Sequence, residues 1–121
     1  MKSRVVKADS LTEFAIPEGC FISELCNEPE DNSVSIALAR VKTGTKTQTH
    51  YLDGIDERYL IIAGKGRVEV DDIPPTEVKA GDLVVIPAGK SQRIENIGNA
   101  DLLFYCICTP PFNPKYYHLI K

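Results

Sequence analysis

Three polar residues in two glycine-bounded segments are the best candidates for chemistry in this sequence. His50 and Glu57 lie in the first segment, residues 44–64, and Gln92 lies in the second, residues 81–96. An imidazole can ligate a metal or transfer a proton near neutral pH, and a carboxylate can ligate or act as a general base. A glutamine amide can form hydrogen bonds or serve as a weak oxygen ligand. These residue types predict a polar site.

The spacing of these residues predicts how strands present them. His50 and Leu52 are two positions apart on a predicted strand, residues 47–52, so both side chains point to the same face. We expect this face to be the interior of a barrel. Glu57 returns on the next strand after an Asp-Gly turn, and a Pro-x-Gly loop brings Gln92 back across from them.

The two segments also resemble a known pair of motifs. They read Gly44-x5-His50-x-Leu52-x4-Glu57-x6-Gly64 and Gly81-x5-Pro87-x-Gly89-x2-Gln92-x3-Asn96. The motifs of the cupin superfamily read G-x5-H-x-H-x3–4-E-x6-G and G-x5-P-x-G-x2-H-x3-N. Every glycine, the proline, one histidine, the glutamate and the asparagine are in register, whereas Leu52 and Gln92 replace two histidines. The resemblance implies a single cupin domain over residues 1–121, a β-barrel of the double-stranded β-helix or jelly-roll type.

The resemblance also implies a metal site. In related cupins the four positions converge on one divalent transition metal, commonly Fe, Mn, Ni, Zn or Cu. Here the implied ligands are His50, Glu57 and Gln92, and Leu52 cannot ligate. Fewer imidazoles bind such an ion more weakly, so we expect a weak or partly open site. The predicted function is binding of a small polar organic ligand beside this metal, which would act as a Lewis acid or oxygen-binding centre. The sequence does not specify a reaction.

A metal-free ligand-binding or sensing cupin without catalytic activity is the alternative. In that case Leu52 makes one wall of the cavity apolar, and His50 is a hydrogen-bonded core histidine. Glu57 then orients neighbouring groups such as Arg58 or Tyr59, and Gln92 lines the pocket. A third hypothesis is a barrel whose cavity is filled by its own side chains.

The four cysteines form no CxxC pair, which favours buried thiols over a zinc ribbon or a disulfide framework. They are Cys20, Cys26, Cys106 and Cys108. Strand alternation puts Cys106 and Cys108 on one face. One of these thiols can face the cavity of a cupin barrel, but the apolar run around them does not identify which face that is.

The elements that must position these residues are short strands, so the fold class is all-β. Apolar and β-branched runs between Gly, Pro and Asp turns predict an antiparallel sandwich or barrel. The predicted strands cover residues 34–41, 47–52, 58–63, 67–70, 83–86, 92–95 and 102–108. Gly64-Lys65-Gly66 reads as a tight hairpin. A short helix is predicted over residues 9–14, with Ser10 as its cap, and an irregular tail over residues 110–121.

Composition limits the classes of partner. The chain has 121 residues, with 43% hydrophobic residues, 26% charged residues and a net charge of −3. Without a basic cluster we expect no nucleic-acid binding. Without a long apolar run or a signal-like beginning we expect no membrane insertion and a cytoplasmic location. The aromatic tail suits an interface, so we expect a homodimer.

Overall fold

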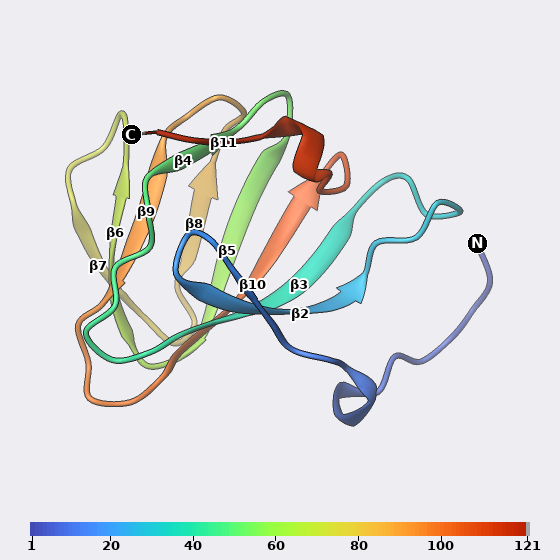
Figure 1. Cartoon of the computed structure of the whole chain (residues 1–121), viewed down its shortest axis with the longest axis horizontal. Helices are drawn as coiled ribbons and strands as arrows, with labels where there is room; N and C mark the ends of the chain where they lie inside the picture. The colour runs from blue at the N-terminus through green and yellow to red at the C-terminus, as the bar shows by residue number, and fades with distance from the viewer. Residues whose placement is uncertain (121) are drawn as a thin grey trace.

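The computed structural model describes residues 1–120 as two antiparallel sheets that face each other (Figure 1). In chain order the elements are η1 (Ala8–Ser10), β1 (Phe14–Ile16), β2 (Cys20–Cys26), β3 (Ser35–Val41), β4 (His50–Leu52), β5 (Asp56–Ala63), β6 (Lys65–Val70), β7 (Thr76–Lys79), β8 (Leu83–Ile86), β9 (Gln92–Asn96), β10 (Leu102–Thr109), η2 (Pro114–Tyr116) and β11 (Tyr117–Leu119). The predicted all-β jelly roll is confirmed.

The order of strands in the sheets brings distant parts of the chain together. The six-stranded sheet runs β1-β2-β3-β10-β5-β8, and the five-stranded sheet runs β11-β4-β9-β6-β7. Figure 1 shows the C-terminal segment with β11 crossing the top of the molecule beside β4. Both termini therefore contribute strands at an edge of a sheet, and neither sheet is complete without them.

The core lies between the sheets, and strand alternation explains which residues enter it. On β9, Gln92, Ile94 and Asn96 are buried while the two residues between them are partly exposed. β5 and β10 show a similar alternation. Burial of this apolar surface is the main stabilising contribution to the fold. The buried hydrophobic cluster consists of Cys20, Ala39, Val41, Tyr59, Ile61, Val68, Val70, Val78, Val84, Ile86, Ile94, Leu102 and Phe104.

The segment around Gly64 is a corner between the sheets, and the predicted hairpin is wrong. β5 ends at Ala63 in the six-stranded sheet, and β6 begins at Lys65 in the five-stranded sheet. Gly64 has a φ of +87°, and a Cβ there would lie 2.7 Å from the carbonyl oxygen of Asp101. Only glycine tolerates this left-handed backbone at such a close approach. A glycine between two predicted strands is compatible with a hairpin and with a corner, so the local sequence does not distinguish them.

The N-terminal segment before β1 is mainly irregular, and the predicted helix over residues 9–14 is wrong. A single 3-10 turn covers Ala8–Ser10, and Phe14 already belongs to β1. Ser10 lies inside the turn, where its hydroxyl donates to the carbonyl of Lys7 rather than capping a helix. A six-residue helix repays its nucleation cost poorly. Pairing with β2 begins at Phe14, the last residue of the predicted helix.

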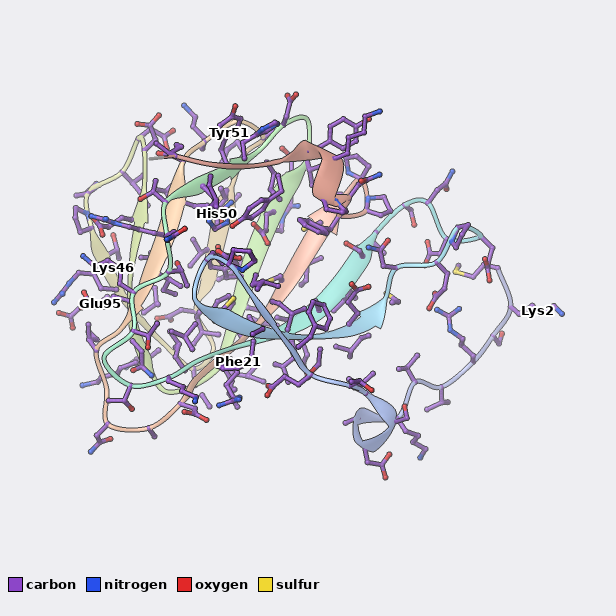
Figure 2. The ribbon with its side chains drawn as sticks, viewed as in Figure 1. Lys2, Phe21, Lys46, His50, Tyr51 and Glu95 are labelled. Carbon is purple, nitrogen blue, oxygen red and sulfur yellow. The ribbon has the colours of Figure 1, made fainter. Side chains whose placement is uncertain are left out.

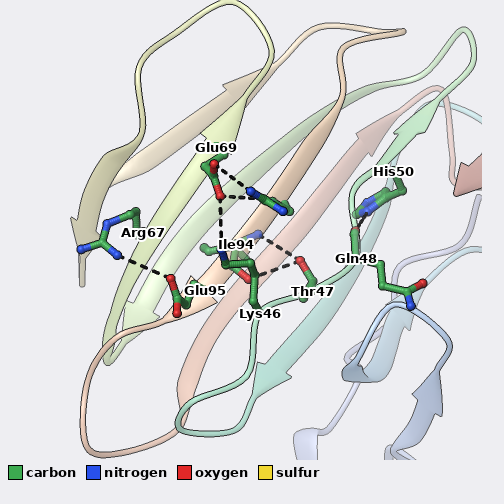
Figure 3. Close-up of polar contacts among 9 residues, drawn as sticks. Lys46, Thr47, Gln48, His50, Arg67, Glu69, Ile94 and Glu95 are labelled. Carbon is green, nitrogen blue, oxygen red and sulfur yellow. Dashed lines mark hydrogen bonds and ion pairs between the residues drawn. The ribbon is translucent and has the colours of Figure 1, made fainter. Parts of the chain in front are cut away.

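The predicted strand over residues 47–52 is shortened at its beginning. β4 covers only His50–Leu52, although the preceding residues still follow β9. The Thr47 amide donates to the Ile94 carbonyl at 2.9 Å, and the Thr47 hydroxyl accepts from the Ile94 amide at 2.9 Å (Figure 3). A side chain thus replaces part of the backbone ladder. The predicted irregular tail also contains order, because β11 pairs with β4, whereas Lys121 lies outside the described residues.

Within residues 1–120, no helix is both long and apolar enough to cross a membrane.

Candidate functional site

A cavity of about 450 Å³ opens beside the core, between the two sheets. Its wall is mostly apolar, with Ile16, Ile22 and Phe112 among its residues, and a group of polar side chains lies among them. The wall comes from β1 to β5, from β10 and from the C-terminal segment. An apolar cavity with a few convergent polar groups is the usual form of a small-molecule site.

His50 and Leu52 enter this cavity together, as their spacing predicts. Both are 3% exposed, and both line the cavity. Figure 2 shows His50 directed into the space between the sheets, while its neighbour Tyr51 points away from it. Tyr51 stacks instead on the exposed His118 of β11, which is consequently outside the site.

Glu18 is a functional neighbour of His50 that the sequence did not reveal. Its Oε2 lies 3.0 Å from Nδ1 of His50, and the Gln48 carbonyl oxygen lies 2.9 Å from the same nitrogen (Figure 3 shows the second contact). Because both neighbours accept hydrogen bonds, Nδ1 carries the proton and Nε2 is the nitrogen left for a ligand. Burial lowers the pKa of His50, but the Glu18 carboxylate outweighs it, so this pKa is raised above 6.5.

A turn holds Glu18 against the histidine. Glu18 lies between β1 and β2, and Gly19 follows it with a φ of +100°. The Gln48 amide donates to the Glu18 carbonyl oxygen at 2.8 Å, which ties the turn to the segment before β4. Glu18 is 32 positions from His50 along the chain, and no local pattern announces the pairing.

Glu57 occupies the wall contributed by β5. Its register partner on β10 is Cys108, whose thiol donates to Oε2 of Glu57 at 3.7 Å. Oε1 of Glu57 is buried without a hydrogen-bond partner in residues 1–120. Burial raises the pKa of Glu57 from 4.5 to about 7, against the opposing effects of His50 and Gln92. The carboxyl can therefore both donate and accept a proton near neutral pH.

The two thiols of β10 face the cavity, which answers the question that the sequence left open. Cys106 and Cys108 both line it, Cys108 buried and Cys106 partly exposed. Burial and the nearby Glu57 carboxylate raise the pKa of each thiol. They are therefore protonated hydrogen-bond donors rather than thiolates. In residues 1–120 all four cysteines are free; Cys20 and Cys108 are buried as predicted, whereas Cys26 and Cys106 are partly exposed.

Gln92 lies next to the site, but its side-chain oxygen already has a hydrogen-bond partner. It is 1% exposed and pairs in register with His50 across β4 and β9. Its Oε1 accepts a hydrogen bond from the hydroxyl of Tyr59. The oxygen that would ligate a metal is thus already used.

Tyr117 closes the site from β11. Its ring stacks on His50 with centroids 5.0 Å apart, and it packs edge-on against Phe112. Its hydroxyl is buried and has no hydrogen-bond partner in the described part of the chain. Phe112 and Tyr117 therefore serve the cavity wall, although the sequence suggested an interface role for the tail aromatics.

In this arrangement the predicted metal ligands offer two groups that remain free to ligate rather than a full set of three. Nδ1 of His50 and Oε1 of Gln92 are taken by protein groups, which leaves Nε2 of His50 and the Glu57 carboxylate. Over residues 1–120, no group of three or more His, Cys, Asp or Glu side chains is placed to hold a metal. Catalytic metal sites generally use three protein ligands. A ligand role for these three residues stays a prediction.

Comparison with known proteins agrees with this architecture. The family model described as the cupin domain matches residues 37–108, which include most of β3, all of β4 to β9 and most of β10. The chain belongs to the cupin family. An uncharacterized protein of Methanocaldococcus jannaschii is 34% identical to this cupin over 115 residues, covering 93% of this chain and 91% of the relative. An oxalate-binding protein of Thermotoga maritima is 35% identical over 71 residues, covering 59% and 58%.

Solved structures share the fold of this cupin. A variant of the Streptomyces protein PAC13, in a structure with uridine, superposes with a TM-score of 0.82 at 15% identity, covering 100% of this chain and 93% of that one. A predicted oxalate decarboxylase of Thermotoga maritima superposes with a TM-score of 0.80 at 24% identity, covering 88% and 99%. At these identities the likeness establishes the barrel and leaves the function to the site.

Proposed function

We propose that this cupin binds a small polar organic ligand in the cavity beside His50, Glu57 and Tyr117, and that binding does not require a metal. One observation carries the proposal. Oε1 of Glu57 and the hydroxyl of Tyr117 are both buried without partners in the described chain, and both residues line the same cavity. The oxalate-binding relative supports a small organic ligand as the class.

Unpaired buried polar groups are costly, which is why they point to a ligand. Each unsatisfied group costs about 1–3 kcal/mol. A ligand that forms hydrogen bonds with Glu57 and Tyr117 recovers this cost, while its apolar part packs on the wall. Native proteins leave few such groups, so two in one cavity indicate a site that is completed on binding.

The site also has the parts for proton exchange with its ligand. Glu57, with a pKa of about 7, lies in the same cavity as His50. Glu18 orients the imidazole by holding its Nδ1, so that Nε2 is left for the ligand. Glu57 and His50 can therefore act as general acid and base on a bound molecule. These groups act without a metal.

Removing the Tyr117 hydroxyl tests the proposal directly. Tyr117→Phe keeps the stack on His50 and deletes only the unpaired group. We expect the ligand-free variant to be as stable as the wild type or more stable, and to bind the compounds found by a thermal-shift screen roughly tenfold more weakly. Tyr116→Phe, on the exposed neighbouring tyrosine, is the matched control and should change neither property. Unchanged affinity in Tyr117→Phe would contradict the proposal.

Metal content distinguishes this proposal from a divalent metal site at His50, Glu57 and Gln92. If no metal is required, elemental analysis of the purified protein should find sub-stoichiometric metal that His50→Ala and Glu57→Ala do not alter. One equivalent of metal that is lost in both variants would instead establish a metal-dependent site.

We also propose that the protein forms a homodimer through the outer face of the six-stranded sheet. Leu83 and Val85 on the edge strand β8 are 55% and 53% exposed. They register with Leu60 and Arg58, whose side chains lie on the same outer face. An apolar sheet face of this kind is typical of a surface that packs on a partner.

Light scattering coupled to size exclusion tests the dimer. Val85→Lys puts a charge among the exposed apolar residues of β8 and should shift the protein to monomer. Ile73→Lys, on an exposed apolar residue between β6 and β7, is the control and should leave the dimer intact. A wild-type monomer at high concentration would rule the dimer out.

We propose a cytoplasmic location because the cysteines of the described chain are free. Four free thiols, three of them in the cavity wall, suit a reducing compartment. Mass spectrometry of protein from its native cells under non-reducing conditions should find all four reduced.

A further inference from the structure

The charged residues of the cavity wall are strongly biased toward one sign. Three carboxylates line the cavity, Glu18 and Glu57 in its interior and Glu24 on an exposed position of β2. His50 is the one basic side chain among the residues that line it within the described chain, and Glu18 holds its Nδ1 at 3.0 Å. Taken together, the His50–Glu18 pair contributes no excess positive charge to the wall.

Two arginines adjacent in sequence to site residues do not supply a positive charge to the cavity, because one lies on the opposite face of its sheet and the other is paired with a glutamate. Arg58 is adjacent to Glu57 on β5, but it alternates to the opposite face and registers with Val85. Arg93, the neighbour of Gln92, is bound by Glu69 with Nε 2.6 Å from Oε2. Neither guanidinium can reach a ligand beside Glu57 without leaving its face of the sheet.

An anionic ligand would therefore lose its hydration and gain no compensating cation. Burying an unpaired charge is expensive, and placing it beside a carboxylate of like sign adds repulsion. Discrimination between ligands often depends on such unfavourable contacts as much as on favourable ones. The wall thus selects against carboxylates and phosphates.

Two buried polar atoms without partners, on residues that line the cavity, define the complement of the ligand. Oε1 of Glu57 needs a hydrogen-bond donor when the carboxyl is ionised, and the Tyr117 hydroxyl can donate or accept. The surrounding apolar residues, such as Ile22 and Phe112, favour a compact hydrocarbon body. A small amine or alcohol on an apolar skeleton satisfies each of these groups.

Resting on the proposed function, we propose that the cavity takes neutral or cationic amphipathic ligands, amines and alcohols, and excludes organic anions. In this respect the chain differs from what the name of its oxalate-binding relative describes. Glu57 is the specificity-determining residue, because its carboxyl has the free oxygen in the wall.

Matched sets of small compounds provide the test. Benzylamine, benzyl alcohol and benzoate share one skeleton, and the corresponding cyclohexyl and butyl compounds extend the set. Binding is measured by ligand-observed NMR with the full chain at about pH 7.5 and with EDTA present, so that no metal can supply positive charge. We expect the amines and alcohols to bind and each carboxylate to bind at least roughly tenfold more weakly than its matched amine.

Glu57→Gln separates the role of the wall from the overall negative charge of the protein. We expect the variant to weaken amine binding by roughly tenfold or more and to narrow the gap between amine and carboxylate. Glu30→Gln, an exposed glutamate outside the cavity, makes the same change in net charge and should leave the preference unchanged.

The outcomes distinguish this inference from the function on which it rests. Carboxylates that bind as well as the amines, with affinities sensitive to Tyr117→Phe, would overturn the ligand class and leave the binding function standing. Absence of binding by every compound in the sets would overturn both. An amine preference that Glu30→Gln reduces as much as Glu57→Gln would assign the preference to net charge and overturn the role of the wall.

Discussion

Replacing Glu57 by glutamine should change how the stability of this protein depends on pH. Glu57 is 7% exposed in the cavity wall, and burial raises the pKa of its carboxyl from 4.5 to about 7. Glutamine has nearly the same shape and cannot ionise. The substitution therefore removes a titrating group while leaving the packing of β5 against β10 almost unchanged.

The sign and size of the effect follow from linkage. Because the folded pKa lies above the unfolded one, the folded protein holds the proton more tightly between about pH 4.5 and about pH 7. The free energy of unfolding of the wild type therefore falls as pH rises through that window. At about 1.4 kcal/mol for each pH unit, the fall attributable to Glu57 is about 3 kcal/mol.

Guanidinium unfolding at fixed protein concentration, with EDTA present, measures this dependence. We expect Glu57→Gln and wild type to have similar free energies of unfolding at about pH 4.5, and the variant to be more stable by about 2–3 kcal/mol at about pH 8. A smaller decline remains in the variant, because His50 also has a raised pKa and its contribution is lost as pH rises through that value.

Two results would refute this reasoning. Parallel stability curves for Glu57→Gln and wild type would show that the carboxyl titrates at its ordinary pKa. A variant that is less stable than wild type at about pH 8 would show that the ionised carboxylate is stabilised by a partner in solution. Glu30→Gln, on the exposed surface, should reproduce the wild-type curve.

Three further predictions concern the scaffold and the thiols. Gly64→Ala should lower the free energy of unfolding by about 2–5 kcal/mol, because alanine is strained in the left-handed region and its Cβ clashes with the backbone at the start of β10. Gly44→Ala is the control: its φ is +76° but the space around it is open, so chemical unfolding should show a loss of only about 1–2 kcal/mol. Asn96→Ala should cost about 2–4 kcal/mol by thermal unfolding, because its buried amide forms two hydrogen bonds to backbone carbonyls at 2.9 and 2.8 Å and its oxygen accepts a third at 2.9 Å; a loss below about 1 kcal/mol would contradict this. Cys106 and Cys108, with raised pKa values, should resist iodoacetamide at about pH 8 until the protein is unfolded, as followed by mass spectrometry.

Much of the barrel could be predicted because strand alternation is a local property. The phase of β9 places Gln92 and Asn96 inside and Arg93 outside, and the structure shows this arrangement. The same period of two places His50 and Leu52 in one cavity. Each of these positions depends only on residues within a few positions of it.

The features that the sequence predicted wrongly or left open depend on contacts between distant segments. Gly64 has the sequence of a hairpin, but β5 and β6 belong to different sheets, and sheet membership depends on what the rest of the chain pairs with. The face of Cys106 and Cys108 depended on the register of β10 against β5, which places Cys108 opposite Glu57.

Taken alone, the sequence determined the cupin barrel and the location of its pocket, because motif spacing and alternation are encoded locally. Tertiary structure decided what the pocket can do. It brought Glu18 to His50, used the oxygen of Gln92 for Tyr59, and left Glu57 and Tyr117 with unpaired atoms in one cavity of the described chain. Those relations arise between residues far apart in the chain, where only folding determines which groups meet and which lose water.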